Sequence, residues 1–111
     1  MLAKTNRLRD KSTISFLFRK GKRIKGTFFS LIYFPNNKSS FQTVVLIAKK
    51  VAKKATRRNR LKRLIVQSIR EIDQQEKLPK VNFIVRILSD PGEMDYTQVK
   101  ENLAPCLKKI S

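Results

Sequence analysis

The chain has 111 residues, and its 26 Lys and Arg outnumber its 8 Asp and Glu to give a net charge of +18. The length predicts one domain, residues 1–111, and a hydrophobic content of 41% is sufficient for a folded core. The absence of His and the single Cys exclude zinc fingers and hydrolases that depend on a Ser-His or Cys-His pair. Because no apolar run is long enough for a membrane span and no signal peptide is evident, the protein is expected to be soluble and cytoplasmic.

The positive charge is concentrated in the first part of the chain. Residues 1–70 carry 20 Lys and Arg and one acid, whereas residues 71–111 carry 6 Lys and Arg and 7 acids. Residues 49–63 alone hold nine basic residues and no acid. Self-repulsion makes this density costly unless a polyanion neutralises it. Nucleic acid is the favoured partner, and an anionic membrane surface is the alternative.

The first half of the chain predicts one helix and two or three strands. Residues 11–20 have helical apolar spacing, with Asp10 or Ser12 as N-cap and Gly21 at the C-terminal end. Residues 27–34 and 41–48 are rich in aromatic and β-branched residues, and the turn-forming stretch 35–40 separates them. They are predicted to be two antiparallel strands. Residues 23–26 either extend the first strand or form a separate edge strand.

Residues 56–77 give the strongest helix prediction, with Thr56 as N-cap and Pro79 as a stop. At 100° per residue this helix has an apolar arc and a basic arc. The apolar arc holds Leu61, Leu64, Ile65, Ser68, Ile69 and Ile72, and the basic arc holds Asn59, Arg60, Lys62, Arg63 and Arg70. Val66 falls on the basic arc, where it is expected to be exposed.

The remaining segments are a strand at 81–88, a turn at 89–92 and a helix at 95–109. Asp95 and Gln98 have capping-box spacing, and Pro105 is expected to kink this helix or end its regular part. Cys106 falls among apolar helix positions and is expected to be a buried, inert thiol. The order α-β-β-β-α-β-α, with a parallel crossover through the long helix, indicates an α+β or α/β sandwich with a small sheet. Of the two we predict the α+β fold, an α-β sandwich whose sheet is mostly antiparallel.

Residues 48–71, AKKVAKKATRRNRLKRLIVQSIRE, carry a specific pattern. A Lys49-Lys50 pair follows a strand, and a basic loop leads to Arg58-Asn59-Arg60 and then Leu-Lys-Arg-Leu. This segment resembles the signature of the bacterial ribonuclease P protein subunit. The resemblance extends to Arg7-Leu8, the helix ending at residues 16–21, the strand around Phe29 and the terminal helix with Leu103. It implies an α-β sandwich whose crossover is left-handed, against the usual rule.

The resemblance also implies a function. The protein would be the RNA-binding subunit of ribonuclease P, an endoribonuclease that removes the 5′ leader from precursor tRNA. The catalytic RNA, with Mg²⁺, would carry the chemistry, and the protein alone would be inactive. It would have no catalytic residues, cofactor or metal site of its own, and would be monomeric apart from the RNA. The alternative is a ribosomal or RNA-chaperone-type protein without a role in processing.

Site residues follow from the resemblance and from residue chemistry, since Arg and Lys bind phosphates and aromatic rings stack on single-stranded bases. Those expected to bind the catalytic RNA are Lys49, Lys50, Lys53, Lys54, Arg57, Arg58, Asn59, Arg60, Lys62, Arg63 and Arg70. Those expected to contact the leader are Arg7, Arg9, Ile14, Phe18 and Arg86.

Three positions depart from the family pattern or remain open. Ile14 stands where a second aromatic residue is common, which would weaken stacking on the leader. Val66 stands where an Arg is common, so one RNA contact would be missing. Asn59 either bonds a base edge or ribose, or ties down the loop before the helix.

Overall fold

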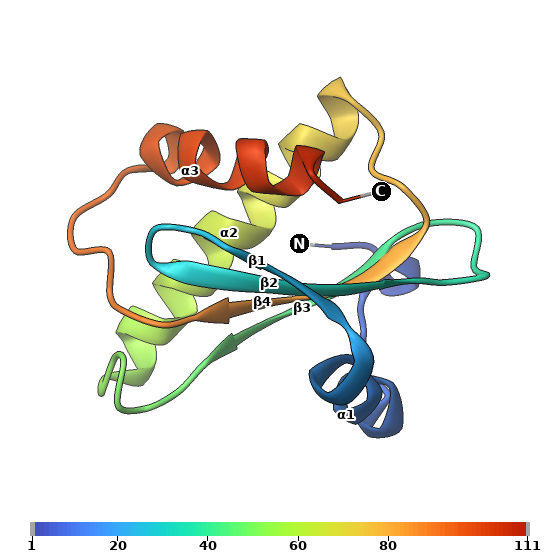
Figure 1. The fold of residues 1–111 in the computed structure, drawn as a ribbon. Helices are drawn as coiled ribbons and strands as arrows, with labels where there is room; N and C mark the ends of the chain where they lie inside the picture. Colours follow the sequence, from blue (N-terminus) through green and yellow to red (C-terminus); the bar gives the residue numbers. More distant parts are fainter. Residues whose placement is uncertain (1, 111) are drawn as a thin grey trace.

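The computed structural model describes residues 2–110 (Figure 1). Its elements follow the predicted order, after a short 3₁₀ turn, η1 (Lys4–Asn6). The helices are α1 (Lys11–Lys20), α2 (Ala55–Gln75) and α3 (Tyr96–Lys108), and the strands are β1 (Lys22–Lys25), β2 (Phe29–Pro35), β3 (Gln42–Ile47) and β4 (Val81–Ile87). None of the helices in the described part of the chain is long and apolar enough to cross a membrane.

The four strands form one sheet in the order β1-β2-β4-β3. β2 pairs antiparallel with β1 and with β4, whereas β3 pairs parallel with β4. The two strands predicted at 27–34 and 41–48 therefore run antiparallel, but β4 lies between them. β4 takes the central place because both of its faces are apolar: Phe83 and Val85 are fully buried on one side and Ile84 on the other. Residues 22–25 form a separate edge strand.

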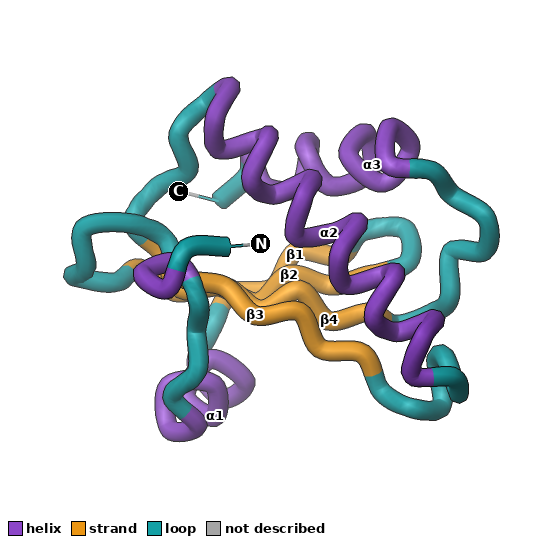
Figure 2. The backbone as a smooth tube through the Cα atoms, turned by 180° about the vertical axis from the view of Figure 1, so that it is seen from behind, coloured by secondary structure: helices purple, strands orange, loops and turns teal. Residues whose placement is uncertain are grey.

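The parallel pair β3 and β4 is joined by α2 in a left-handed crossover. Seen from the α2 side of the sheet with both strands pointing up, β4 lies to the left of β3 (Figure 2). This confirms the handedness that the family resemblance implied. Right-handed crossovers are the rule for such units, so strand twist and local propensity would have predicted the opposite arrangement.

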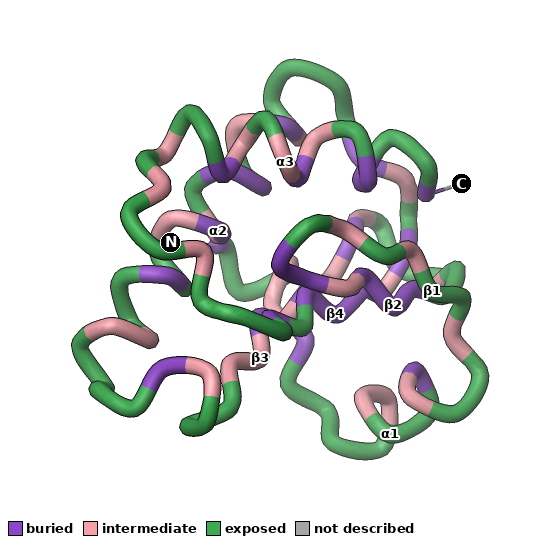
Figure 3. Tube along the Cα trace, turned by 60° about the vertical axis from the view of Figure 1, so that its left-hand side comes forward, coloured by how far each residue is buried: buried purple, intermediate pink, exposed green. Residues whose placement is uncertain are grey.

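Helices cover both faces of the sheet. α2 and α3 lie on one face and α1 on the other (Figure 1). The larger core is between the sheet, α2 and α3, and includes Phe29, Phe83, Ile69 and Leu103. The smaller core lies under α1 and consists of Leu8, Leu17, Ile32 and Ile84. Burial is concentrated in β2 and β4, the two central strands (Figure 3).

The ends of α1 and α3 follow the sequence signals, but the start of α2 does not. Asp10 caps α1 by accepting a hydrogen bond from the Ser12 amide, and Asp95 and Gln98 form the expected capping box of α3. The prediction of Thr56 as N-cap of α2 is wrong: Lys54 holds that position and its side chain makes no capping bond. α3 continues past Pro105 to Lys108, so the proline does not end the helix.

Gly21 ends α1 for a reason other than the one its position suggested. Its φ of −68° is not left-handed, so the conformation itself does not require glycine. A Cβ at this position would lie 2.5 Å from the Leu17 carbonyl oxygen and 2.7 Å from Cγ2 of Ile32. Glycine is therefore needed so that the chain can leave α1 close to the buried face of β2.

Glu71 fastens α3 to α2. Its carboxylate accepts hydrogen bonds from the Tyr96 hydroxyl and from Nζ of Lys100, the latter at 2.9 Å. These two bonds hold the pKa of Glu71 below its usual value. Burial of the phenol, aided by its bond to the carboxylate, raises the pKa of Tyr96 to about 12. The pair thus favours a charged Glu71 beside a neutral Tyr96.

Candidate nucleic-acid interface

The basic arc of α2 and the loop before it form one exposed surface. The apolar arc faces the core, where Leu61, Ile65 and Ile69 are almost completely buried. The opposite arc is exposed because helical periodicity places it away from the core. The exposed predicted RNA ligands on this surface, here called the basic face, are Lys49, Lys50, Lys53, Lys54, Asn59, Arg60, Lys62, Arg63 and Arg70.

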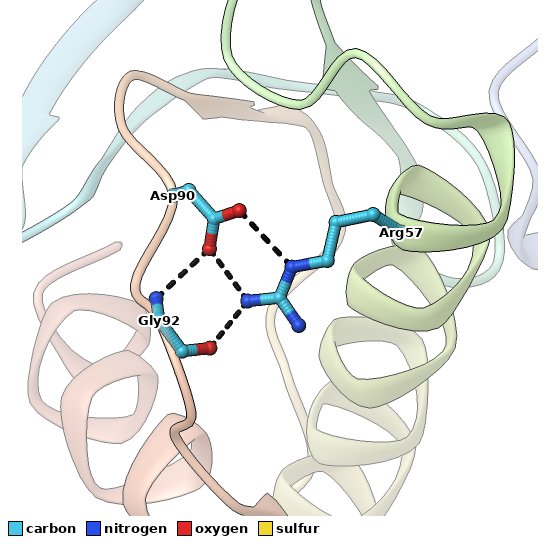
Figure 4. Close-up of polar contacts among 3 residues, drawn as sticks. All are labelled: Arg57, Asp90 and Gly92. Atoms are coloured by element: carbon cyan, nitrogen blue, oxygen red, sulfur yellow. Dashed lines mark hydrogen bonds and ion pairs between the residues drawn. The ribbon is translucent and has the colours of Figure 1, made fainter.

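Arg57 has a partner within its own chain (Figure 4). Its Nε and Nη2 donate to the two carboxylate oxygens of Asp90, at 3.0 and 2.5 Å, and Nη2 also donates to the Gly92 carbonyl. The guanidinium holds the pKa of the Asp90 carboxyl below its usual value. This contact ties the start of α2 to the β4–α3 loop. Arg57 therefore has a structural role that its place in the sequence did not reveal.

Arg58 also binds backbone rather than facing outward. Its Nη1 donates to the carbonyl oxygens of Ala52 and Lys53, at 2.8 and 2.9 Å. The bonds close the loop that leads into α2, so Arg58 shapes the surface on which the loop lysines are presented. The loop before the helix is thus tied down by Arg58. Asn59 lies exposed on the helix, where its amide is accessible to a base edge or ribose.

A groove runs between α2, the edge of the sheet and the N-terminal segment, and we call it the α2 groove. It has a volume of about 900 Å³. The N-terminal segment reaches it because Arg7 bridges to Thr43 of β3 and the Leu8 amide donates to the Thr43 carbonyl. The groove is lined by Leu2, Arg7, Leu8, Arg9, Thr43, Val44, Val45, Asn59, Lys62, Arg63, Val66, Gln67 and Arg70.

The predicted leader residues divide between two places. Ile14 and Phe18 pack from α1 against the smaller core, and the guanidinium of Arg86 on β4 lies 6.0 Å from the Phe18 ring centroid. This spacing suits a cation–π contact. Arg7 and Arg9 instead line the α2 groove, and Nε of Arg7 donates to the Leu2 carbonyl. The structure thus brings together three of the five residues and places the other two beside the basic face.

We call the first of these places, where partly exposed apolar side chains of α1 meet the sheet, the α1 patch. Val44 and Leu46 of β3 also pack there while remaining partly exposed, beside Ile14 and Phe18. Neither was predicted as a site residue, although strand alternation separates both from Val45 on the opposite face. Phe16 lies elsewhere, edge-on against Phe34 with ring centroids 5.0 Å apart.

The prediction that Val66 is exposed on the basic arc is wrong. Val66 is partly buried, packs against the larger core and forms a wall of the α2 groove. The helical wheel could not show this, because the N-terminal segment that makes the other wall comes from residues 2–9. Val66 therefore adds apolar surface within a basic site.

Within residues 2–110, no three or more His, Cys, Asp or Glu side chains lie close enough to hold a metal ion. Cys106 is buried in the core, as expected. The chemistry available at the surface is that of guanidinium and ammonium groups binding phosphate, with aromatic and aliphatic side chains contacting bases.

Comparison with known proteins gives a consistent result. A family model described as Ribonuclease P matches residues 2–111. The "Ribonuclease P protein component" of Pseudanabaena sp. (strain PCC 6903) is 31% identical over 110 residues, which cover 98% of this chain and 94% of that protein. The Thermotoga maritima protein of the same description is 34% identical over 111 residues, covering 94% of this chain and 91% of that protein.

Solved structures agree with the sequence comparisons. The ribonuclease P protein from Thermotoga maritima has a TM-score of 0.78 and 28% identity, covering 95% of this chain and 97% of that one. The Staphylococcus aureus protein, at 21% identity, matches in fold with a TM-score of 0.75 over 93% of both chains. Together with the Arg58-Asn59-Arg60 motif on an exposed basic helix, these matches show that the chain belongs to the ribonuclease P protein family.

Proposed function

We propose that this protein is the RNA-binding subunit of a ribonuclease P holoenzyme and assists removal of the 5′ leader from precursor tRNA. The observation that carries the proposal is the basic face, on which Arg60, Lys62 and Arg63 of the family motif are exposed together. The positive charges of these side chains complement the negative charges of the phosphate backbone of the catalytic RNA. Arg57 and Arg58 contribute by fixing the position of that surface.

The α1 patch contacts the single-stranded leader. The Phe18 ring offers a stacking surface and Arg86 a cation for the adjoining phosphate, which is the usual combination in single-strand binding. Val44 and Leu46 extend the apolar floor. Because Ile14 stands where a second ring is common, stacking at this patch rests mainly on Phe18. The two sites lie on different parts of the molecule, so RNA subunit and substrate can be bound at once.

The catalytic RNA, with Mg²⁺, carries the cleavage step. The protein contributes cations that reduce repulsion between two polyanions, the catalytic RNA and the precursor. It therefore lowers the salt and Mg²⁺ concentrations at which the complex forms. Binding of the leader makes the holoenzyme hold precursor tRNA more tightly than mature tRNA.

The test is precursor tRNA cleavage at low Mg²⁺ by a bacterial ribonuclease P RNA, with and without the protein. Cleavage is expected only when both are present. Binding of precursor tRNA and of mature tRNA, which lacks the leader, then tests the α1 patch. Phe18→Ala should reduce the preference for the precursor by roughly 5- to 100-fold, as expected for one stacked base. Cleavage by protein alone, or RNA binding that never supports cleavage, would contradict the proposal; the latter is expected of an RNA chaperone.

A further inference from the structure

The α2 groove has apolar walls inside a ring of cations. Leu8 and Val45 are at least nine-tenths buried at its base, and Val66 lines it from α2. Lys62, Arg63 and Arg70 lie along the α2 rim. A surface that only contacts phosphates needs no hollow with aliphatic walls. The volume of about 900 Å³ is in the range of sites that enclose a small organic group.

A buried hydroxyl beside the groove is left without a partner. Thr43 is 2% exposed, and its Oγ1 makes no hydrogen bond within residues 2–110. Thr43 borders the groove on the same sheet face as Val45. Buried hydroxyl groups in folded proteins nearly always have a hydrogen-bond partner. An unsatisfied one at the edge of an open groove points to a polar group that binds there.

The groove also presents amide groups that can read a base. Asn59 and Gln67 are exposed on the α2 wall, and each offers a donor and an acceptor. Aliphatic walls suit the face of a ring, amides suit its edge, and Arg or Lys suits the phosphate attached to it. A lipid chain would not use the amides, and an acidic peptide would not need the flat apolar walls.

We propose that the α2 groove binds one unstacked nucleotide of the catalytic RNA, with its base against Val66 and its phosphate at the cationic rim. The inference rests on the proposed function, since it names a contact within the RNA-binding surface. It gives Val66 a role: the apolar side chain keeps the groove open where an arginine would fill it. The hydroxyl of Thr43 gains a hydrogen-bond partner when the base is bound.

The first experiment uses small probes and the full chain. Methyl resonances of Thr43 and Val66 are followed by NMR during titration with adenosine 5′-monophosphate, ribose 5-phosphate and inorganic phosphate. The nucleotide is expected to shift both methyl groups in a saturable manner, whereas the two probes without a base should leave them unchanged. Equal shifts with all three probes would show a phosphate site only and overturn the proposal.

The second experiment compares two variants that add the same charge. Val66→Arg fills the groove, while Gln74→Arg adds an arginine at an exposed position of α2 that does not line it. If a base enters the groove, Val66→Arg should weaken binding to a bacterial ribonuclease P RNA by about 10-fold, despite the added charge. Gln74→Arg should bind as well as the parent or slightly better. Melting curves confirm that both variants fold.

A third variant separates binding from stability. Thr43→Val keeps the shape of the side chain and removes the hydroxyl, so the melting temperature should not fall. The affinity for adenosine 5′-monophosphate should nevertheless fall several-fold. If Thr43→Val and Val66→Arg bind both nucleotide and catalytic RNA as the parent does, the groove proposal fails while the proposed function stands. If the parent protein does not bind the catalytic RNA, the proposed function fails instead.

Discussion

Residues 1–70, which are strongly basic, and residues 71–111, which carry slightly more acids than cations, differ in what their charged side chains do. In the acidic part, Glu71 and Asp90 bind cationic side chains, Asp73 accepts a hydrogen bond from the Leu78 amide, and Asp95 caps α3. The cations of the basic face are exposed. Within residues 2–110 the only salt bridges are Arg57–Asp90 and Lys100–Glu71. Four of the seven acids in residues 71–111 therefore make contacts that hold the fold, whereas most cations of residues 1–70 are left to a partner.

The largest expected effect is on RNA affinity. Replacing both Arg60 and Arg63 by Gln should weaken binding to the catalytic RNA by about 100-fold, because two charge-assisted phosphate contacts are lost. The slope of log affinity against log salt should become less steep by about 2. Filter binding over a salt series measures both. The matched control is Lys108→Gln with Lys109→Gln, at exposed positions near the end of α3; an equal loss there would mean that net charge alone decides.

The unpartnered cations should also make folding depend on anions. Sulfate at ten times its dissociation constant should stabilise the native state by about 1.4 kcal/mol and raise the melting temperature by roughly 6–10 °C. Thermal unfolding is compared with sodium chloride at equal ionic strength. The Arg60 and Arg63 double variant should show a smaller rise. Identical melting temperatures in sulfate and chloride would contradict the idea that the exposed cations bind anions in the native state.

Neighbouring arginines on α2 should behave oppositely. Arg57→Gln should lower stability by about 0.5–1 kcal/mol, the usual size for a partly exposed ion pair, and leave the salt slope of RNA binding unchanged. Arg60→Gln should change the slope by about 1 and leave the melting temperature nearly unchanged. A salt slope altered by Arg57→Gln would show that Arg57 releases Asp90 to bind RNA.

The contribution of the Arg57–Asp90 pair to stability has a defined pH dependence. Because the pKa of Asp90 is lowered in the folded state, its stabilising effect is complete above the ordinary carboxyl pKa and is lost as the pH falls through the folded value. The wild type and Arg57→Gln should therefore melt at the same temperature in sufficiently acidic solution. A stability difference that persists there would come from the bond to Gly92 instead.

The smallest expected effect concerns Tyr96. Its pKa is raised from 10.0 to about 12, so the stabilisation from its neutral hydroxyl is complete below pH 10 and is lost as the pH rises toward 12. The stability difference between the wild type and Tyr96→Phe should shrink over that interval. It should stay below about 1 kcal/mol because solvent screens a partly exposed pair. A constant difference from pH 9 to 12 would show that Tyr96 acts only through packing.

Local patterns were sufficient for the elements and for the basic face. Helical spacing located α2 and its two arcs, and β-branched runs located β2 and β4. The cap at Asp10 and the capping box at Asp95 were also readable, because each depends on residues two or three positions apart. The strand order was not readable, since β4 must pass between β2 and β3 after a 21-residue helix, and no local preference encodes that placement.

Composition and the Arg58-Asn59-Arg60 motif are enough to identify a small basic protein with a helix suited to RNA. Which of its cations face outward depends on tertiary contacts. Arg57 and Arg58 carry the same charge as Arg60, but Asp90 and the Ala52 carbonyl come within reach of them only when the loops fold. Val66 likewise became a groove wall through packing beside the N-terminal segment. Composition and periodicity act along the chain, whereas partners and cavities arise between residues that only folding brings together.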